Sequence, residues 1–97
     1  MAVDIRFERK ADEDLEEIVE FLGVTSTAAR RFAERFDRGI AQLLLFPESA
    51  PNDGTGVRVL YLTRTSYAIV YEFNEGQLTI LSVAHASRPR TEPTSRP

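Results

Sequence analysis

The pattern of apolar and polar positions predicts a short strand and then a helix near the start of the chain. Residues 3–7 alternate between apolar and polar side chains, which is typical of a strand with one buried face. The apolar positions that follow recur three and four residues apart, as on one stripe of a helix. They are Leu15, Ile18, Val19 and Leu22. Asp12 is the expected N-cap of this helix and Gly23 its expected end.

A second, longer helix is predicted between residues 25–27, whose hydroxyls can cap it, and Pro47, which ends it. Its apolar positions keep the helical spacing for about five turns. They are Ala29, Phe32, Ala33, Phe36, Ile40, Leu43 and Leu44. The connection between the two helices is short, so we expect an antiparallel hairpin. Phe32 and Phe36 are expected to anchor this hairpin on a sheet.

Three strands are predicted in the second half of the chain, over residues 57–62, 67–73 and 77–84. Because their connections are short, they should form an antiparallel meander. Together the elements predict an α+β fold. In it, the N-terminal strand and the meander form one sheet, and the helical hairpin covers the apolar face of that sheet.

The alternation within the predicted strands assigns side chains to the two faces of the sheet. Tyr71 is expected to share a face with Ile69 and Phe73. In the last strand the same alternation places Ile80 on one face and Val83 on the opposite face. The sheet should therefore have one apolar face, covered by the hairpin, and one mixed face.

The length of 97 residues fits one domain, which we expect to cover residues 1–88. Residues 89–97 are rich in Pro and Arg and contain no large apolar side chain, so we expect a flexible tail. The absence of cysteine excludes a disulfide framework and thiol catalysis. No signal core and no apolar run of membrane-spanning length, about 20 residues, is present. A cytoplasmic protein without a membrane partner is expected.

Charge is unevenly distributed along the chain, although the net charge is only −3 and the pI about 5.1. This balance argues against tight direct binding of nucleic acid. Residues 12–20 contain six acids and no base, which we interpret as a solvated helix face. The outer face of the second predicted helix carries its charged side chains. They are Arg30, Arg31, Glu34, Arg35, Asp37 and Arg38. This face is either solvated, with internal ion pairs, or a surface for a partner.

His85 is the only histidine and the main candidate for chemistry. Its ordinary pKa suits a general base, although a structural hydrogen bond is the alternative. No second His or Cys completes a metal site, and no Gly-rich phosphate loop indicates a cofactor. Arginines near the strand ends stand beside tyrosines, which suits either nucleic acid or an acidic peptide. These residues are Arg58, Arg64, Arg88, Arg90, Tyr61, Tyr67 and Tyr71.

An ordered set of motifs then resembles one superfamily. The motifs are Ala11-x-x-Asp14-Leu15-x-x-Ile18, the Phe32/Phe36 helix, Leu43-Leu44-x-Phe46-Pro47, Arg58, Tyr67-x-Ile69-x-Tyr71 and Leu81-x-Val83-x-His85-x-x-Arg88. In this order and spacing the chain is similar, over about residues 3–88, to toxins of the ParE/RelE superfamily from type II toxin–antitoxin modules.

The resemblance implies a cognate antitoxin that wraps and neutralises the toxin, often as an extended strand and a helix. An acidic antitoxin would meet basic and aromatic side chains on the second helix and at the strand ends. The candidate contacts are Arg31, Arg35, Arg38, Arg58, Tyr61, Arg64, His85 and Arg88.

The superfamily divides by mechanism. RelE-like members cut messenger RNA, whereas ParE-like members are not nucleases and poison DNA gyrase. The RelE-like pattern has Arg where this chain has Ala68, and lysines where it has Val59 and Tyr61. The resemblance is thus closest to the ParE-like branch, which implies a bacterial plasmid-stabilisation type of toxin without catalytic residues or cofactor. The alternatives are an endoribonuclease using His85 with Arg58 and Arg88, and a non-toxic binding module of a repressor complex.

Overall fold

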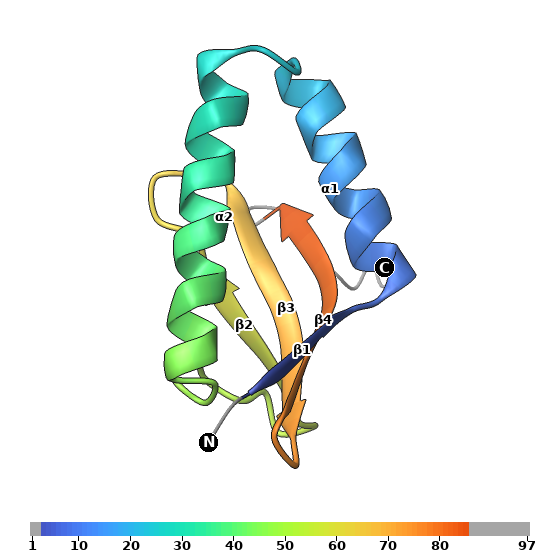
Figure 1. Cartoon of the computed structure of the whole chain (residues 1–97), viewed down its shortest axis with the longest axis vertical. Helices are drawn as coiled ribbons and strands as arrows, with labels where there is room; N and C mark the ends of the chain where they lie inside the picture. Colours follow the sequence, from blue (N-terminus) through green and yellow to red (C-terminus); the bar gives the residue numbers. More distant parts are fainter. Residues whose placement is uncertain (1–2, 86–97) are drawn as a thin grey trace, which may run out of the picture.

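A computed structural model describes residues 3–85 and shows an α+β fold, in which a two-helix hairpin lies on a four-stranded sheet (Figure 1). The elements are β1 (Asp4–Phe7), α1 (Arg9–Leu22), α2 (Thr27–Leu45), β2 (Val57–Tyr61), β3 (Tyr67–Asn74) and β4 (Gln77–His85). The predicted order of elements is confirmed. Arg88, Arg90 and the tail predicted for residues 89–97 lie outside the described residues.

The strand order in the sheet is β1-β4-β3-β2. The last three strands form the predicted antiparallel meander, and β1 joins it in parallel beside β4. The N–H of Glu8 donates to the carbonyl of Ile80 over 2.9 Å and fixes the end of β1 on β4. The buried face predicted for residues 3–7 forms only in part. Phe7 packs on the core, whereas Ile5, near the edge of the sheet, is 37% exposed.

A β-bulge changes the faces of β4. Val70 pairs with Ser82 and the next residue, Tyr71, pairs with Ile80, so Leu81 is an extra residue in β4. A bulge of this kind interrupts strict alternation. The predicted alternation of β4 was therefore wrong beyond the bulge. Val83 shares the hairpin face with Ile80, and both are buried.

Helix α1 begins at Arg9 with Glu8 as its N-cap, which corrects the predicted N-cap at Asp12. The reason is the pairing of β1: because Glu8 still bonds to β4, the chain enters the helix directly afterwards. The predicted end is confirmed, since Gly23 takes φ 96° and its N–H donates to carbonyls of the last turn. The predicted cap of α2 is confirmed at Ser26, whose hydroxyl accepts the Ala29 N–H over 3.0 Å.

The buried stripe of α1 is rotated by one position from the predicted one. The buried residues are Ala11, Asp14 and Ile18. Leu15 and Leu22 are half-buried at the margin of the core, whereas Val19 does not pack against it. The stripe therefore contains one acid, which the sequence pattern had assigned to the solvated face.

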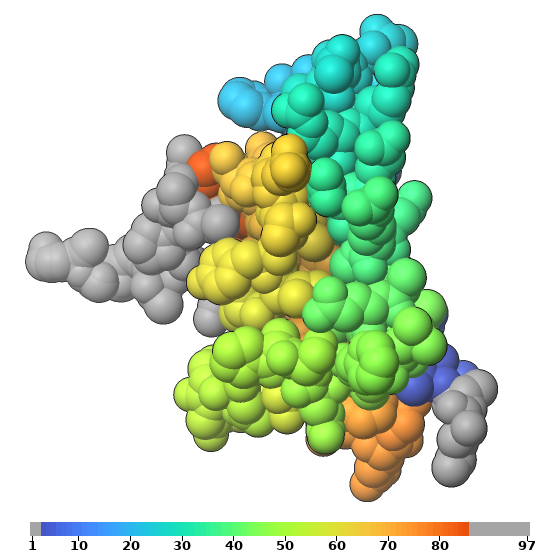
Figure 2. Space-filling view, turned by 90° about the vertical axis from the view of Figure 1, so that its left-hand side faces the viewer, coloured from blue at the N-terminus to red at the C-terminus, as the bar shows by residue number. Residues whose placement is uncertain are grey.

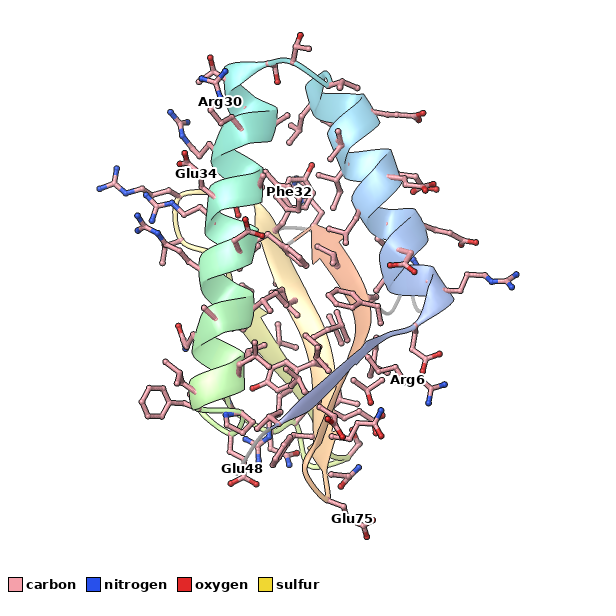
Figure 3. All side chains as sticks on the ribbon, viewed as in Figure 1. Arg6, Arg30, Phe32, Glu34, Glu48 and Glu75 are labelled. Carbon is pink, nitrogen blue, oxygen red and sulfur yellow. The ribbon has the colours of Figure 1, made fainter. Side chains whose placement is uncertain are left out.

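Aromatic rings connect α2 to the sheet. Phe32 is 3% exposed, stacks on Phe36 with 5.9 Å between ring centroids, and meets Tyr67 edge-on at 5.3 Å. Figure 3 shows Phe32 pointing inward, while Arg30 and Glu34 point away from the sheet. At Gly39 the helix comes so close to the sheet that a Cβ would lie 2.8 Å from the Leu62 Cδ2.

Neither helix of the described chain is long and apolar enough to cross a membrane.

Candidate functional site

A cleft opens between the tip of the hairpin and the adjacent end of the sheet; it is called the tip cleft below. It is lined by residues of both helices, the β2–β3 turn and the strand ends. They include Phe21, Arg31, Phe32, Arg64, Tyr67 and His85, with Asp14 and Glu17 on the α1 side. Phe21 is 82% exposed, which is unusual for a phenylalanine. Figure 2 shows the hairpin tip overhanging the end of the sheet.

The bulge in β4 places His85 in this cleft. His85 pairs with Tyr67, and directly opposed residues share a face of the sheet, so both face the hairpin. Without the extra residue at Leu81, His85 would face the other side. The rings of Tyr67 and His85 meet edge to face, with centroids 5.2 Å apart. Bulges commonly re-aim a side chain in this way.

Asp14 fixes the α1 wall of the tip cleft. Its carboxylate is buried, accepts the Val83 N–H over 3.0 Å and forms an ion pair with the Lys10 Nζ at 2.6 Å. The hydrogen bond and charge of Asp14 raise the pKa of Lys10. Asp14 therefore corrects the interpretation of residues 12–20 as a wholly solvated face. Its spacing from Ala11 and Ile18 was the sequence signal for burial.

A second cleft, called the edge cleft below, lies between α2 and the end of β2. It is lined by Arg35, Arg38, Gly39, Gln42, Leu60, Tyr61, Leu62 and Thr63. Tyr61 is 65% exposed, Arg35 is half-buried and Arg38 is exposed. The salt bridges found in residues 3–85 join Arg6 to Glu8 and Lys10 to Asp14, so the ion pairs suggested for the outer face of α2 do not form within this part.

Arg58 lies in neither cleft, because it holds the loop that follows α2. Its guanidinium donates to the carbonyls of Ala50 at 2.6 Å and Glu48 at 3.3 Å. Next to it, the Tyr71 hydroxyl donates to the carbonyl of Pro47 over 2.9 Å. Burial of the Tyr71 ring raises the pKa of its phenol. These contacts stabilise the loop end of the sheet.

The structure thus divides the predicted site residues among several regions. The tip cleft contains Arg31, Arg64 and His85; the edge cleft contains Arg35, Arg38 and Tyr61. On β3, the partners of His85 and Arg58 are Tyr67 and Tyr71, which are four residues apart, or about 13 Å along the strand. Arg58, bound to its loop, and His85 therefore lie in separate regions. Arg88 lies outside the described residues.

The sequence analysis missed Phe21 as a functional candidate. The signal was a large aromatic residue that falls beside the apolar stripe of the first helix, two residues before Gly23. Such a side chain gains little from the core and is free to meet a partner.

Within the described part of the chain, no group of three or more His, Cys, Asp or Glu is arranged to hold a metal ion.

The face of the sheet away from the hairpin carries two neighbouring pairs of uncharged residues towards the Tyr61 end of β2. Tyr61 lies opposite Ala68, and Val59 lies opposite Val70, so all four share this face. Ala68 and Val70 are buried. The positions at which the RelE-like pattern has cations, Val59, Tyr61 and Ala68, are therefore neighbours in space.

Comparisons with known proteins agree with this architecture. The chain is similar in fold to a chain of the chromosomal ParDE toxin–antitoxin system from P. aeruginosa, with a TM-score of 0.70 and 22% identity over 86% of this chain and 95% of that one. A chain of the RelBE2 toxin–antitoxin complex from Mycobacterium tuberculosis gives a TM-score of 0.47 and 17% identity, over 88% and 92% of the two chains. No curated protein sequence matches. The model of the ParE toxin family of the type II toxin–antitoxin system parDE matches residues 5–90, and the chain belongs to this family.

Proposed function

We propose that this ParE-family toxin acts in the bacterial cytoplasm by binding DNA gyrase as a protein ligand, and that a cognate antitoxin neutralises it. Membership of the ParE toxin family supports the proposal, because the resemblance to ParE-like toxins implies a poison of gyrase. The structural neighbour from P. aeruginosa comes from a toxin–antitoxin system, which supports an antitoxin partner for this chain as well.

One observation favours a gyrase-binding protein over a ribonuclease. Val59, Tyr61 and Ala68 form an uncharged patch at the positions where RelE-like toxins have cations. RNA cleavage requires cations for the charge that develops on the phosphorane, and docking among RNA phosphates requires a basic surface. This chain has a net charge of −3 and pairs uncharged residues at those positions.

The direct test adds folded, purified toxin to purified gyrase at a saturating concentration and measures supercoiling of relaxed plasmid. The proposal predicts loss of supercoiling, and recovery when the cognate antitoxin is added first. Heat-denatured toxin, added at the same concentration, provides the control for non-specific inhibition. Normal supercoiling in the presence of folded toxin would refute the gyrase target.

A second candidate function has its own support. The tip cleft brings His85 together with Arg31 and Arg64, beside the ring of Tyr67. A general base near cations and an aromatic ring suits cleavage of a single-stranded RNA. This ribonuclease would use Arg31 and Arg64 in place of Arg58, which is bound to its own loop, whereas Arg88 lies outside the described residues.

The ribonuclease candidate is tested with His85→Ala. The variant should fold, because His85 is half-buried at a strand end. If it arrests growth as wild type does, His85 takes no part in toxicity and the ribonuclease candidate falls. Loss of toxicity together with loss of RNA cleavage in vitro would favour the ribonuclease over the gyrase proposal. If expression of the wild-type chain has no effect on growth, both toxin mechanisms are excluded and a non-toxic binding module is the remaining function.

A further inference from the structure

An exposed ring stands between the two hollows that make up the tip cleft. The basic hollow is lined by Phe21, Arg31 and Arg64, among others. The acidic hollow is lined by Phe21, Asp14 and Glu17, among others. Phe21 belongs to both, yet it is 82% exposed and so fills neither. A large apolar ring that stands in water beside two hollows indicates an interaction surface.

The basic hollow takes its two cations from different elements. Arg31 lies on α2, and Arg64 lies in the turn between β2 and β3. This turn holds Arg64 at φ 63°, in the left-handed region that residues other than glycine seldom adopt. Thr65 fixes the turn, because its hydroxyl donates to the carbonyl of Leu62 over 2.9 Å and accepts the Tyr67 N–H over 3.1 Å. The backbone of Arg64 is therefore held in place at the basic hollow.

The acidic hollow presents one carboxylate that is available to a partner. Asp14 is buried and already accepts the Val83 N–H, whereas Glu17 is exposed. Within residues 3–85, the side chains of Glu17, Arg31 and Arg64 make no hydrogen bond or ion pair. Opposite charges thus lie in two hollows beside one exposed ring, and neither charge is paired within this part of the chain.

This surface is complementary to itself. In a twofold dimer every contact occurs twice, because residue i of one copy meets residue j of the other and j meets i. The basic hollow of each copy would face the acidic hollow of the other, and each Phe21 would enter the cleft of the other copy. Buried aromatic rings are enriched in protein interfaces, and opposite charges beside them fix the orientation of the partners.

Other occupants match only part of this surface. An acidic segment would suit Arg31 and Arg64 but would also meet the carboxylate of Glu17. Residues 86–97 contain three arginines and one glutamate, so they suit the acidic hollow alone. RNA phosphates would face the same carboxylate on a chain of net charge −3. A second copy supplies a ring and charges of both signs together.

We infer that two copies of this chain associate across their tip clefts about a twofold axis. Phe21 of each copy enters the cleft of the other, and Arg31 of each copy pairs with Glu17 of the other. The cleft is incomplete without the second copy, which supplies the ring that fills it. This inference goes beyond the proposed function, because it concerns the chain in the absence of antitoxin and gyrase.

The first test measures the molar mass of the full chain by sedimentation equilibrium, at concentrations up to about 1 mM. Wild type should rise from the monomer mass of 10.9 kDa towards twice that mass. Phe21→Ala should raise the dissociation constant by at least roughly thirtyfold, as expected of a central interface residue. Phe46→Ala is the matched control, because Phe46 is also exposed, at 62%, but lies at the opposite end of α2. It should dimerise as wild type does.

Charge reversal tests the orientation of the two copies. Arg31→Glu and Glu17→Arg should each weaken the dimer roughly tenfold or more, since like charges then meet in both contacts. A mixture of the two variants should form a dimer again. Arg31→Glu retains Glu17 and Glu17→Arg retains Arg31, so opposite charges meet in both contacts of the mixed dimer. Arg30→Glu, on the same helix but pointing away from the sheet (Figure 3), should dimerise as wild type does.

Several outcomes would overturn the inference. One is a chain that stays at the monomer mass at every concentration, whether its tip cleft then takes residues 86–97, RNA or an antitoxin. Another is a Phe21→Ala variant, or a pair of charge variants, that dimerises as tightly as wild type. Charge variants that stay monomeric when mixed would do the same. None of these measurements contains gyrase, so this inference and the proposed function can fail separately.

Discussion

The two ends of β3 use similar residues for different purposes. At the loop end, Arg58 and Tyr71 donate to carbonyls of residues 47–50, and the Tyr71 ring is fully buried. At the tip end, Tyr67 lines a cleft with Arg31 and His85. The comparison teaches that an arginine beside a tyrosine does not identify a binding site. What matters is whether the fold already supplies partners for the arginine.

The largest expected effect is on the free energy of unfolding, and it distinguishes a core residue of α2 from an exposed residue near the tip of the hairpin. Phe32→Ala should lower the free energy of unfolding by about 3–5 kcal/mol, since it removes a buried ring between α2 and the sheet. Phe21→Ala, which truncates a ring that is 82% exposed, should change it by less than about 0.5 kcal/mol. Urea unfolding followed by circular dichroism measures both. Equal stability of the two variants would mean that the hairpin does not pack as described.

The next effect concerns the attachment of α1. Asp14→Ala leaves the Val83 N–H without its acceptor and should cost about 1–3 kcal/mol. Glu13→Ala, at the exposed position next to it, is the matched control and should be nearly neutral. Thermal denaturation gives the stability, and faster hydrogen exchange at Val83 would locate the change. Unaltered exchange there would show that Asp14 does not tie α1 to β4.

A smaller effect contrasts the two tyrosines of β3. Tyr71→Phe removes a hydrogen bond to the Pro47 carbonyl and should cost about 1 kcal/mol. Tyr67→Phe should cost less, because the Tyr67 ring, and not its hydroxyl, contacts Phe32 and His85. Chemical denaturation of the pair measures the difference. A reversed order would contradict the assignment of the loop end as the structural end.

The smallest effect is the pH dependence of stability in alkali. Burial raises the pKa of Tyr71 from its ordinary value of 10.0, so the unfolded chain releases this proton at lower pH than the folded one. The stabilisation of the folded state that comes from this raised pKa is complete below pH 10.0. It is lost as the pH rises through the raised pKa of Tyr71. Tyr71→Phe should therefore have a flatter alkaline limb than wild type. The pKa of Lys10 is also raised, but Lys10 is present in both wild type and Tyr71→Phe. Its effect on stability therefore cancels when the two proteins are compared.

Local patterns were sufficient to predict the elements and their order, because helical spacing and alternation are properties of neighbouring residues. The meander followed from its short connections. The pattern could not reveal the bulge at Leu81, since an extra residue in a strand depends on its pairing with β3. The position of His85 in the tip cleft depends on that bulge. It could therefore not be predicted from the alternation of apolar and polar residues.

Other features of the site could not be predicted from the sequence because they depend on contacts between residues far apart in the chain. The buried carboxylate of Asp14 accepts the N–H of Val83, 69 residues later, and its spacing from Ala11 and Ile18 gives no sign of that partner. Arg31 and Arg64 meet in one cleft only after the hairpin packs on the sheet. Arg58 was a candidate because it is an arginine near a strand end, but in the fold its guanidinium donates to the carbonyls of residues 48 and 50.

Pulse-labelling in cells tests the proposed action of the toxin on gyrase most directly. Bacteria are induced to make this chain alone, and incorporation of labelled thymidine and methionine is followed separately over the first minutes. An early fall in DNA synthesis, with protein synthesis intact, is the predicted result. An early fall in protein synthesis would contradict the claim and favour RNA cleavage at the tip cleft.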